Sequence, residues 1–157
     1  MGYSWKYLEH PADIKVEVKA DSLRDLFKGA LKTLAEILHP GNLQTGESIT
    51  QELNISSLNQ EVLLVDFLNE VLTFSDIYNT IFDRVEFKVF RPQRLRAIIK
   101  GKRVKSFREE IKGVTYHGIS IKKEGNHWRA ILLLDCLLYT SDAADEGLGV
   151  DLGGRRI

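Results

Sequence analysis

The sequence predicts an α+β fold: a single domain in which two main helices pack on mostly antiparallel β-sheet. Apolar residues recur at helical spacing in two segments, 23–38 and 59–76, whereas the chain from Thr80 to Leu134 alternates as successive strands. Strands that are grouped apart from helices argue against a doubly wound parallel sheet. The 157 residues, 43% of them apolar, are enough for one domain with a sizeable core.

Alternation of apolar and polar residues predicts eight strands. The last three follow one another with short turns, at Gly118 and at Glu124-Gly125-Asn126, so we expect a meander that a hairpin closes. The predicted strands are residues 3–8, 14–20, 49–55, 81–90, 95–100, 111–116, 119–123 and 128–134.

The two predicted helices differ in pattern. Ser22 and Asp25 have the spacing of a helix cap before the first helix, which carries one apolar stripe and ends at His39-Pro40-Gly41. Apolar residues cover more than one stripe of the second helix, so we expect it to be more deeply buried than the first. Its polar residues form a single ridge, which is either a solvated outer face or a contact surface for a partner. This ridge consists of Asp66, Asn69, Glu70 and Thr73.

Composition limits the classes of function. The chain has 22 basic and 22 acidic residues, and this balance is too weak for a non-specific nucleic-acid binder. A single cysteine, Cys136, permits no internal disulfide, and the four scattered histidines offer no zinc spacing. The longest apolar runs are a few residues, so we expect no membrane span. Because the amino terminus also lacks the apolar core of a signal peptide, we expect a cytoplasmic protein.

One segment has a strong local charge bias. From Arg91 to Arg108 there are eight basic residues and no acidic ones. This basic stretch is either a binding surface for RNA, nucleotide or an acidic partner, or simply the solvent-exposed side of a hairpin. The second interpretation is open because Arg94, Arg96 and Lys100 share the parity of one strand face. No exposed aromatic residues are interleaved with these charges.

The last 22 residues differ in their residue pattern from the rest of the chain. Reverse translation of Cys136–Glu146 resembles the end of a transposon-based sequencing adapter, and the residues after it resemble the flow-cell adapter that follows. We therefore interpret residues 136–157 as translated adapter DNA, foreign to a domain of residues 3–135. We expect this tail to be disordered.

Two acidic residues flank apolar strands that are far apart in the sequence. Asp13 precedes the strand at 14–20 and Asp135 follows the strand at 128–134, so their carboxylates can meet at one edge of a sheet. Both are hard oxygen donors without a soft ligand nearby, which favours calcium, with magnesium as the alternative. Two carboxylates alone leave the coordination shell of such an ion incomplete. Backbone carbonyls, water or the terminal carboxylate of a chain ending at position 136 would complete it.

Four segments carry the likeness to a known family. They are Tyr7-Leu8-Glu9-His10-Pro11-Ala12-Asp13-Ile14, Leu63-Leu64-Val65-Asp66-Phe67-Leu68-Asn69-Glu70-Val71-Leu72, Glu110-Ile111-Lys112-Gly113-Val114-Thr115-Tyr116-His117 and Ile131-Leu132-Leu133-Leu134-Asp135. Together they resemble archease over residues 3–135. The resemblance implies the archease fold and a protein that is not itself an enzyme. Such a protein activates the GTP-dependent tRNA-splicing RNA ligase RtcB, promoting guanylylation of the ligase histidine and multiple turnover in tRNA splicing and RNA repair.

The resemblance also implies roles for individual residues. Asp13 and Asp135 match the family's calcium-binding aspartates, and Cys136 stands where the last residue of the family completes the site with its carboxyl group. Lys112 matches the lysine that is implicated in activating the ligase. His10 and His117 are neighbouring candidates, which serve either the function or the hydrogen bonding of a turn.

The chain departs from the family pattern at three places. Pro11 stands where threonine is usual, and Gly101-Lys102 stands where Gly-Glu is frequent. The surroundings of that second position are less basic in the family. Cys136 occupies the terminal position, and a translated tail after it would turn the carboxylate into a peptide carbonyl, which weakens ion binding.

Two other classes of function stay open beside the activator. A metal-dependent hydrolase would use Asp13, Asp135 and Lys112, although the sequence offers neither a second metal cluster nor an evident nucleophile and base. A small RNA-binding module would use the basic stretch at 91–108.

Overall fold

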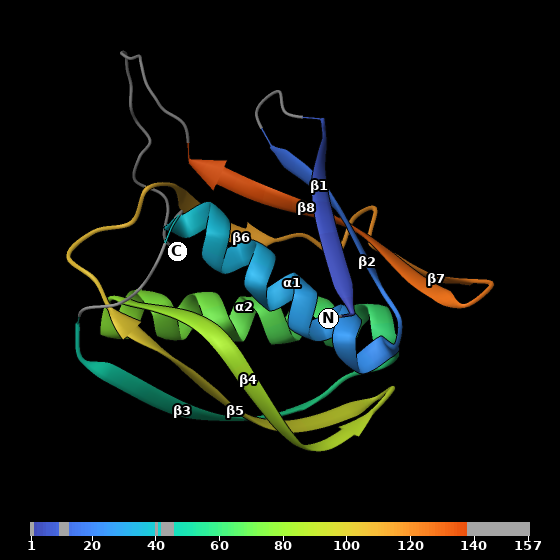
Figure 1. Ribbon diagram of the computed structural model, residues 1–157, viewed down its shortest axis with the longest axis horizontal. Coiled ribbons are helices and arrows are strands. Elements are labelled where there is room, and N and C mark those ends of the chain that lie inside the picture. Colours follow the sequence, from blue (N-terminus) through green and yellow to red (C-terminus); the bar gives the residue numbers. More distant parts are fainter. Residues whose placement is uncertain (1, 10–12, 40, 42–45, 138–157) are drawn as a thin grey trace.

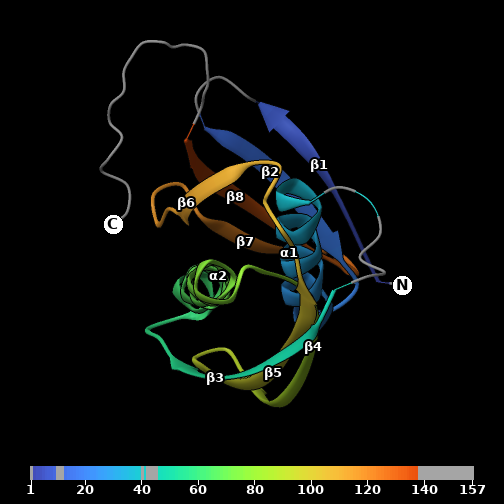
Figure 2. The same ribbon diagram turned by 90° about the vertical axis from the view of Figure 1, so that its left-hand side faces the viewer.

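Two β-sheets enclose a layer of two helices. The computed structural model describes residues 2–9, 13–39, 41 and 46–137. Figure 1 shows the strands and helices along the chain, and Figure 2 shows the helices between the two sheets. In chain order the elements are β1 (Tyr3–Glu9), β2 (Ile14–Ala20), α1 (Leu23–Leu38), β3 (Ser48–Ser56), α2 (Gln60–Tyr78), β4 (Thr80–Arg91), β5 (Arg94–Arg103), β6 (Glu110–Val114), β7 (Ser120–Glu124) and β8 (His127–Leu137).

All strand pairs in both sheets are antiparallel. The large sheet has five strands in the order β1-β2-β8-β6, with β7 also paired to β8. The small sheet has three strands in the order β3-β5-β4. The predicted α+β architecture with two helices on antiparallel sheet is therefore confirmed, and each predicted strand has its counterpart within a few residues.

The predicted meander of the last three strands is wrong. β6 and β7 do not pair with each other; both pair with the same edge of β8, β7 over residues 127–131 and β6 over residues 134–137. Between them, the Thr115 N–H donates to the Leu133 carbonyl at 3.0 Å, so the connecting turn also follows β8. β8 is longer than either partner, and it therefore serves as the template for two short collinear strands.

Both helices begin at the residues that the sequence indicates. The Ser22 hydroxyl accepts from the Asp25 N–H at 3.0 Å before α1, and the Asn59 side chain accepts from the Val62 N–H at 2.9 Å before α2. α1 buries ten of its 16 residues and α2 eight of its 19, so the expectation of a more deeply buried second helix is wrong. The polar ridge of α2 lines a cavity that β3 also borders, and Asn69 of this ridge bonds to Val114 of β6. Neither helix in the described residues is long and apolar enough to cross a membrane.

The core lies between the sheets, where the helices meet them. Four phenylalanine rings pack together: Phe27 of α1, Phe67 of α2, and Phe87 and Phe90 of β4, with centroids 4.9–6.5 Å apart. The inward residues of β2 and β8 close the core from the large sheet. This packing fixes the small sheet against the helices, and it leaves the outer side of that sheet uncovered (Figure 2).

Candidate functional site

Asp13 and Asp135 lie at the same end of the large sheet. β2 and β8 are neighbours, and the last residue pair at this end is Ile14 opposite Leu134. The next residue beyond that pair is Asp13 on one side and Asp135 on the other. Side chains at opposing positions of an antiparallel pair lie within a few ångströms at the Cβ atoms. The register thus brings together two carboxylates that are separated by most of the chain.

Lys112 reaches the same place through a β-bulge. Ile111 pairs with Cys136 and Gly113 pairs with Asp135, so β6 holds one more residue than β8 here, and that residue is Lys112. A bulge changes the direction of the inserted side chain, and bulges are frequent beside functional sites. The Lys112 ammonium lies 3.9 Å from Asp135 Oδ2, and both side chains are accessible to solvent. A cation and two carboxylates therefore share one end of the sheet.

The Cys136 side chain is buried, unlike the carboxylates beside it. Its thiol donates to the Leu134 carbonyl across 3.8 Å. Burial raises the pKa of the Cys136 thiol to about 12, and the carboxylates of Glu109, Asp13 and Asp135 add to the rise. Calcium and magnesium prefer oxygen to sulfur, so a contact of such an ion at this position would come from main-chain oxygen and not from the buried thiol.

The two candidate histidines have different outcomes. His10 lies outside the described residues. His117 lies in the turn after β6, where its N–H donates to the Thr115 hydroxyl at 3.0 Å and its carbonyl accepts from the same hydroxyl at 3.1 Å. Its imidazole is on an exposed residue, and no described interaction joins it to Lys112 or Asp135. Both hydrogen bonds involve the main chain of His117, which any residue could supply, so the role of the imidazole stays a prediction.

Asp66 and Glu70 lie away from that end of the sheet, in a cavity of about 440 Å³. Its walls come from α2, β3 and the turn after β6. The Asp66 carboxylate accepts from the Ser57 hydroxyl at 2.6 Å and from the Tyr116 hydroxyl. The hydrogen bond to Asp66, together with partial burial, raises the pKa of the Tyr116 phenol above its ordinary value. The cavity residues are Asn54, Ile55, Ser56, Asp66, Asn69, Glu70, Thr73 and Tyr116.

Asn69 joins the cavity to the strand that carries Lys112. Its amide nitrogen donates to the Val114 carbonyl at 3.0 Å, and its amide oxygen accepts from the Val114 N–H at 2.8 Å. The ridge of α2 is thus neither a purely solvated face nor a bare docking surface. One member of the ridge anchors β6, and the others line the cavity.

The residues at the sheet end fit a hard divalent cation in part. Asp13 and Asp135 are the oxygen donors that calcium and magnesium prefer. Among the described residues there is no group of three His, Cys, Asp or Glu side chains placed to hold a metal ion. Main-chain oxygen and water would have to supply the rest of the shell.

Comparison with known proteins decides the family. The model of the Archease protein family (MTH1598/TM1083) matches residues 5–136, which include both aspartates, Lys112 and Cys136. The chain belongs to the archease family. It is 28% identical over 142 residues to the archease of Methanosarcina acetivorans, covering 85% of this chain and 97% of the relative. The archease of Pyrococcus abyssi is 29% identical over 139 residues, covering 83% of this chain and 97% of the relative.

Solved structures agree on the archease fold. A crystal structure from Thermotoga maritima, described as an archease and possible chaperone, has a TM-score of 0.61 and 20% identity, covering 83% of this chain and 95% of its own. The solution structure of protein 1598 of Methanobacterium thermoautotrophicum has a TM-score of 0.62 and 24% identity, covering 85% and 98%. At these identities the likeness concerns the fold alone.

Sequence reasoning missed three features around the archease site. The bulge at Lys112 depends on pairing with β8, and no local pattern announces it. The second feature is Glu109, whose negative charge adds to the rise that burial causes in the pKa values of Tyr7 and Cys136. The third feature is the link from Asn69 to Val114, for which the polar ridge was a partial signal.

Proposed function

We propose that this archease is a protein cofactor that activates the GTP-dependent tRNA-splicing RNA ligase RtcB, and that it is not itself an enzyme. It promotes guanylylation of the ligase and repeated turnover in tRNA splicing and RNA repair. The observation that carries the proposal is the convergence of Asp13, Asp135 and Lys112 at one end of the large sheet in a chain of the archease family. A ligase active site with a bound nucleotide presents phosphate oxygens and metal-binding groups, and both are partners for such a constellation.

Each residue has a distinct part in this proposal. Asp13 and Asp135 hold a calcium ion, with magnesium as the alternative, and the oxygen at Cys136 adds a further ligand. When bound, the ion supplies positive charge that fixes the two carboxylates. Lys112 keeps its ammonium exposed at the bulge of β6, where it can contact a phosphate or an acidic side chain of the ligase. Asn69 holds that strand against α2.

The direct test measures covalent guanylylation of RtcB with labelled GTP, with and without the intact archease. Stimulation by the native chain and its loss with Asp13→Ala is the expected result. Absence of stimulation by a correctly folded native chain would reject the activator role. Phosphate release from GTP without any ligase would instead support the metal-dependent hydrolase.

The ion is tested separately by calorimetric calcium titration. A chain ending at residue 136 should bind calcium more tightly than the 157-residue chain, because a terminal carboxylate replaces a peptide carbonyl. Absence of heat with both chains, in calcium and in magnesium, would reject the metal assignment. The activator role would still stand on the guanylylation result.

A further inference from the structure

None of the described elements covers the outer face of the small sheet, which carries many charges. α1 and α2 pack on its inner face, where Leu95, Ala97 and Ile99 are fully buried (Figure 2). The alternate residues of β5 therefore point outward, and the register places their partners on β3 and β4 beside them. The charged residues of this outer face are Arg84, Glu86, Lys88 and Arg91 of β4, Arg94, Arg96, Lys100 and Lys102 of β5, and Glu52 of β3.

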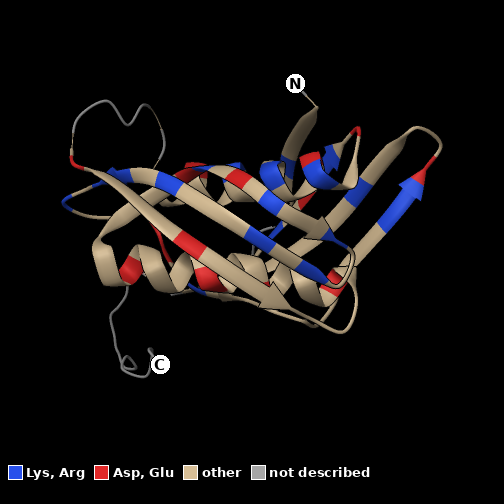
Figure 3. Cartoon of the chain, turned by 90° about the horizontal axis from the view of Figure 1, so that it is seen from below, with Lys and Arg blue, Asp and Glu red and all other residues tan. Residues whose placement is uncertain are grey.

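Positive charge predominates on this face, although the chain as a whole is neutral. Seven Lys and Arg side chains face two glutamates. Glu52 pairs with Arg96 at 3.7 Å, and Glu86 is shared between Lys88 at 2.9 Å and Lys100 at 3.7 Å. Two carboxylates neutralise two of the seven cations, so an excess of five positive charges is left. Figure 3 looks onto this side of the molecule, where blue bands outnumber red ones on the three strands.

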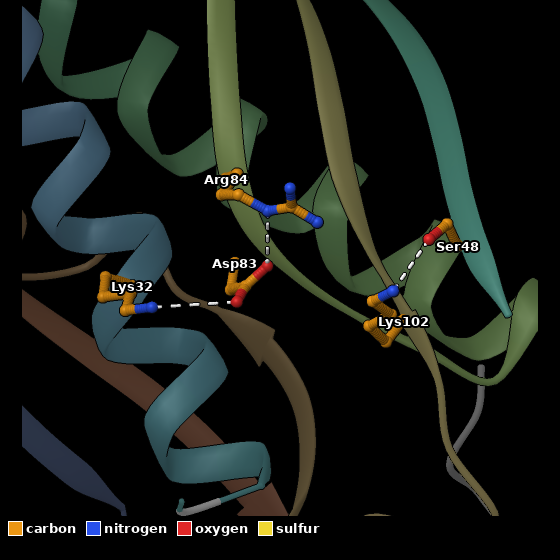
Figure 4. Close-up of polar contacts among 5 residues, drawn as sticks. All are labelled: Lys32, Ser48, Asp83, Arg84 and Lys102. Carbon is orange, nitrogen blue, oxygen red and sulfur yellow. Dashed lines mark hydrogen bonds and ion pairs between the residues drawn. The ribbon is translucent and has the colours of Figure 1, made fainter. Parts of the chain in front are cut away.

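Further contacts of the cations do not cancel this excess. The Lys102 ammonium donates to the neutral Ser48 hydroxyl at 2.9 Å. Asp83 sits at a bulge of β4 and pairs with Arg84 at 3.4 Å, but it also pairs with Lys32 of α1 at 3.7 Å (Figure 4). Asp83 shares its negative charge between Arg84 and Lys32, and even a full offset of Arg84 leaves four of the seven cations without a compensating carboxylate.

The shape of the patch suits an extended polyanion. The outward cations of β5 run from Arg94 to Lys102, which is about 27 Å along a strand, and the cations of β4 form a second row beside them. Phosphates repeat along a nucleic-acid backbone, so several of these side chains can engage one strand at once. A single small anion would use a small part of the patch.

The face lacks what a protein interface or base recognition needs. Phe87 and Phe90 of β4 point into the core, where they pack on Phe27. The apolar residues at outward register positions are Ile81, which is buried, and Val89 and Ile98, which are half-buried. Protein interfaces concentrate energy in aromatic anchors surrounded by uncharged contacts, and single-strand readers stack bases on aromatic rings. A face of flexible cations matches contact to phosphates alone.

We infer that the outer face of the β3–β5–β4 sheet binds the sugar-phosphate backbone of RNA without reading its sequence. It lies on the side of the helix layer opposite the large sheet that carries Asp13 and Asp135, so RNA and a partner at that site do not compete for one surface (Figure 1). The choice of RNA over DNA rests on the proposed function, in which the partner is an RNA ligase. The charge argument does not depend on it.

The test is fluorescence anisotropy of a labelled single-stranded 20-nucleotide RNA with the full chain, without ligase, at several salt concentrations. The logarithm of the binding constant should fall linearly with the logarithm of salt concentration. The variant Arg94→Gln/Arg96→Gln/Lys100→Gln should reduce that slope by about 2 and weaken binding at 0.1 M salt by at least about tenfold. Absence of binding by the native chain at low salt would overturn the inference.

The matched control removes three exposed lysines from the large sheet. Lys19→Gln/Lys122→Gln/Lys123→Gln changes the net charge equally, on exposed residues of β2 and β7. This control should bind RNA nearly as well as the native chain. An equal loss in both triple variants would mean that net charge controls binding, and the face would have no special part. Displacement of RNA by a polyglutamate peptide at equal charge concentration would overturn the assignment of RNA as the ligand and favour an acidic protein.

The ligase assay separates this inference from the proposed function. Guanylylation of RtcB with GTP needs no RNA substrate, so the triple β5 variant should stimulate it as the native chain does. If the triple β5 variant loses RNA binding but fully stimulates guanylylation, RNA and the ligase use two separate surfaces of the protein. RNA binding by a chain that fails to stimulate would leave the inference standing and reject the activator role.

Discussion

Lys112 of β6 and Asp135 of β8 form an ion pair of 3.9 Å across a β-bulge, at the sheet end where Asp13 precedes β2. Asp135 pairs with Gly113, and Lys112, the extra residue of that bulge, directs its ammonium to the Asp135 carboxylate. Both side chains are exposed, so the pair contributes little to folding stability. Under the proposed function, the pair keeps the Lys112 ammonium at an accessible position, where a partner can contact it.

Substitution of Lys112 should therefore affect activation more than folding. We expect Lys112→Ala to lower stimulation of RtcB guanylylation by at least about tenfold, because a positioned cation at a reacting phosphate contributes on that scale. Its unfolding free energy in urea should change by less than about 0.5 kcal/mol. Lys122→Ala on β7 is the matched control, since that lysine is also on an exposed strand residue. Equal activity of both variants would remove Lys112 from the mechanism.

Calcium binding should respond in opposite directions to the two partners of this pair. Asp135→Asn removes a charged ligand and should abolish the rise in melting temperature that calcium produces, which corresponds to about 2.7 kcal/mol at 100 times the dissociation constant. Lys112→Gln removes a nearby positive charge and should tighten calcium binding severalfold. Differential scanning fluorimetry across a calcium series measures both. Weaker calcium binding by Lys112→Gln would contradict this electrostatic assignment.

Asn69 should stabilise the fold through β6. Asn69→Leu removes two hydrogen bonds and leaves the N–H and carbonyl of buried Val114 without their helix partner, which should cost about 2–3 kcal/mol. Urea denaturation measures the loss, and hydrogen exchange should show faster opening of β6. Thr73→Ala on the same ridge is the control and should cost less than about 0.5 kcal/mol, because its hydroxyl is exposed and bonds within the helix. A loss confined to Thr73→Ala would refute the anchoring role.

Glu17 should make stability depend on pH. Burial acts to raise the pKa of its carboxyl, but the hydrogen bond and charge of Arg129, with Lys6 at 3.6 Å, outweigh burial and hold that pKa below its ordinary value. A lowered pKa in the folded state stabilises the protein above the unfolded pKa, and this stabilisation disappears as pH falls through the folded value.

Unfolding free energies from pH 7 down to pH 3 test this linkage. The unfolding free energy of the native chain should fall below about pH 5. Glu17→Gln should lower this free energy at pH 7 by about 1–3 kcal/mol and should make its decrease at acid pH, the acid limb, less steep. Glu52→Gln, on an exposed residue of the small sheet, is the control and should leave the limb unchanged. An acid limb as steep in Glu17→Gln as in the native chain would assign the dependence to other carboxylates.

Local patterns were enough to predict most of the secondary structure. The cap at Ser22, the single stripe of α1 and the alternation of the strands are properties of neighbouring residues, so periodicity reveals them without knowledge of the fold. Both helix positions and the antiparallel α+β class were confirmed on this basis. The expectation that α2 is more deeply buried than α1 was wrong, because a helix can be apolar on most sides and still expose one polar ridge to a cavity.

The sequence by itself determined the α+β class, the approximate positions of the helices and strands, and the membership of the archease family. Tertiary structure alone decided that β6 and β7 share one edge of β8, that a bulge turns Lys112 toward Asp135, and that the cations of β5 gather with those of β4 on one open face. The reason is physical. Side-chain periodicity is local, whereas strand pairing and register depend on contacts between residues far apart along the chain.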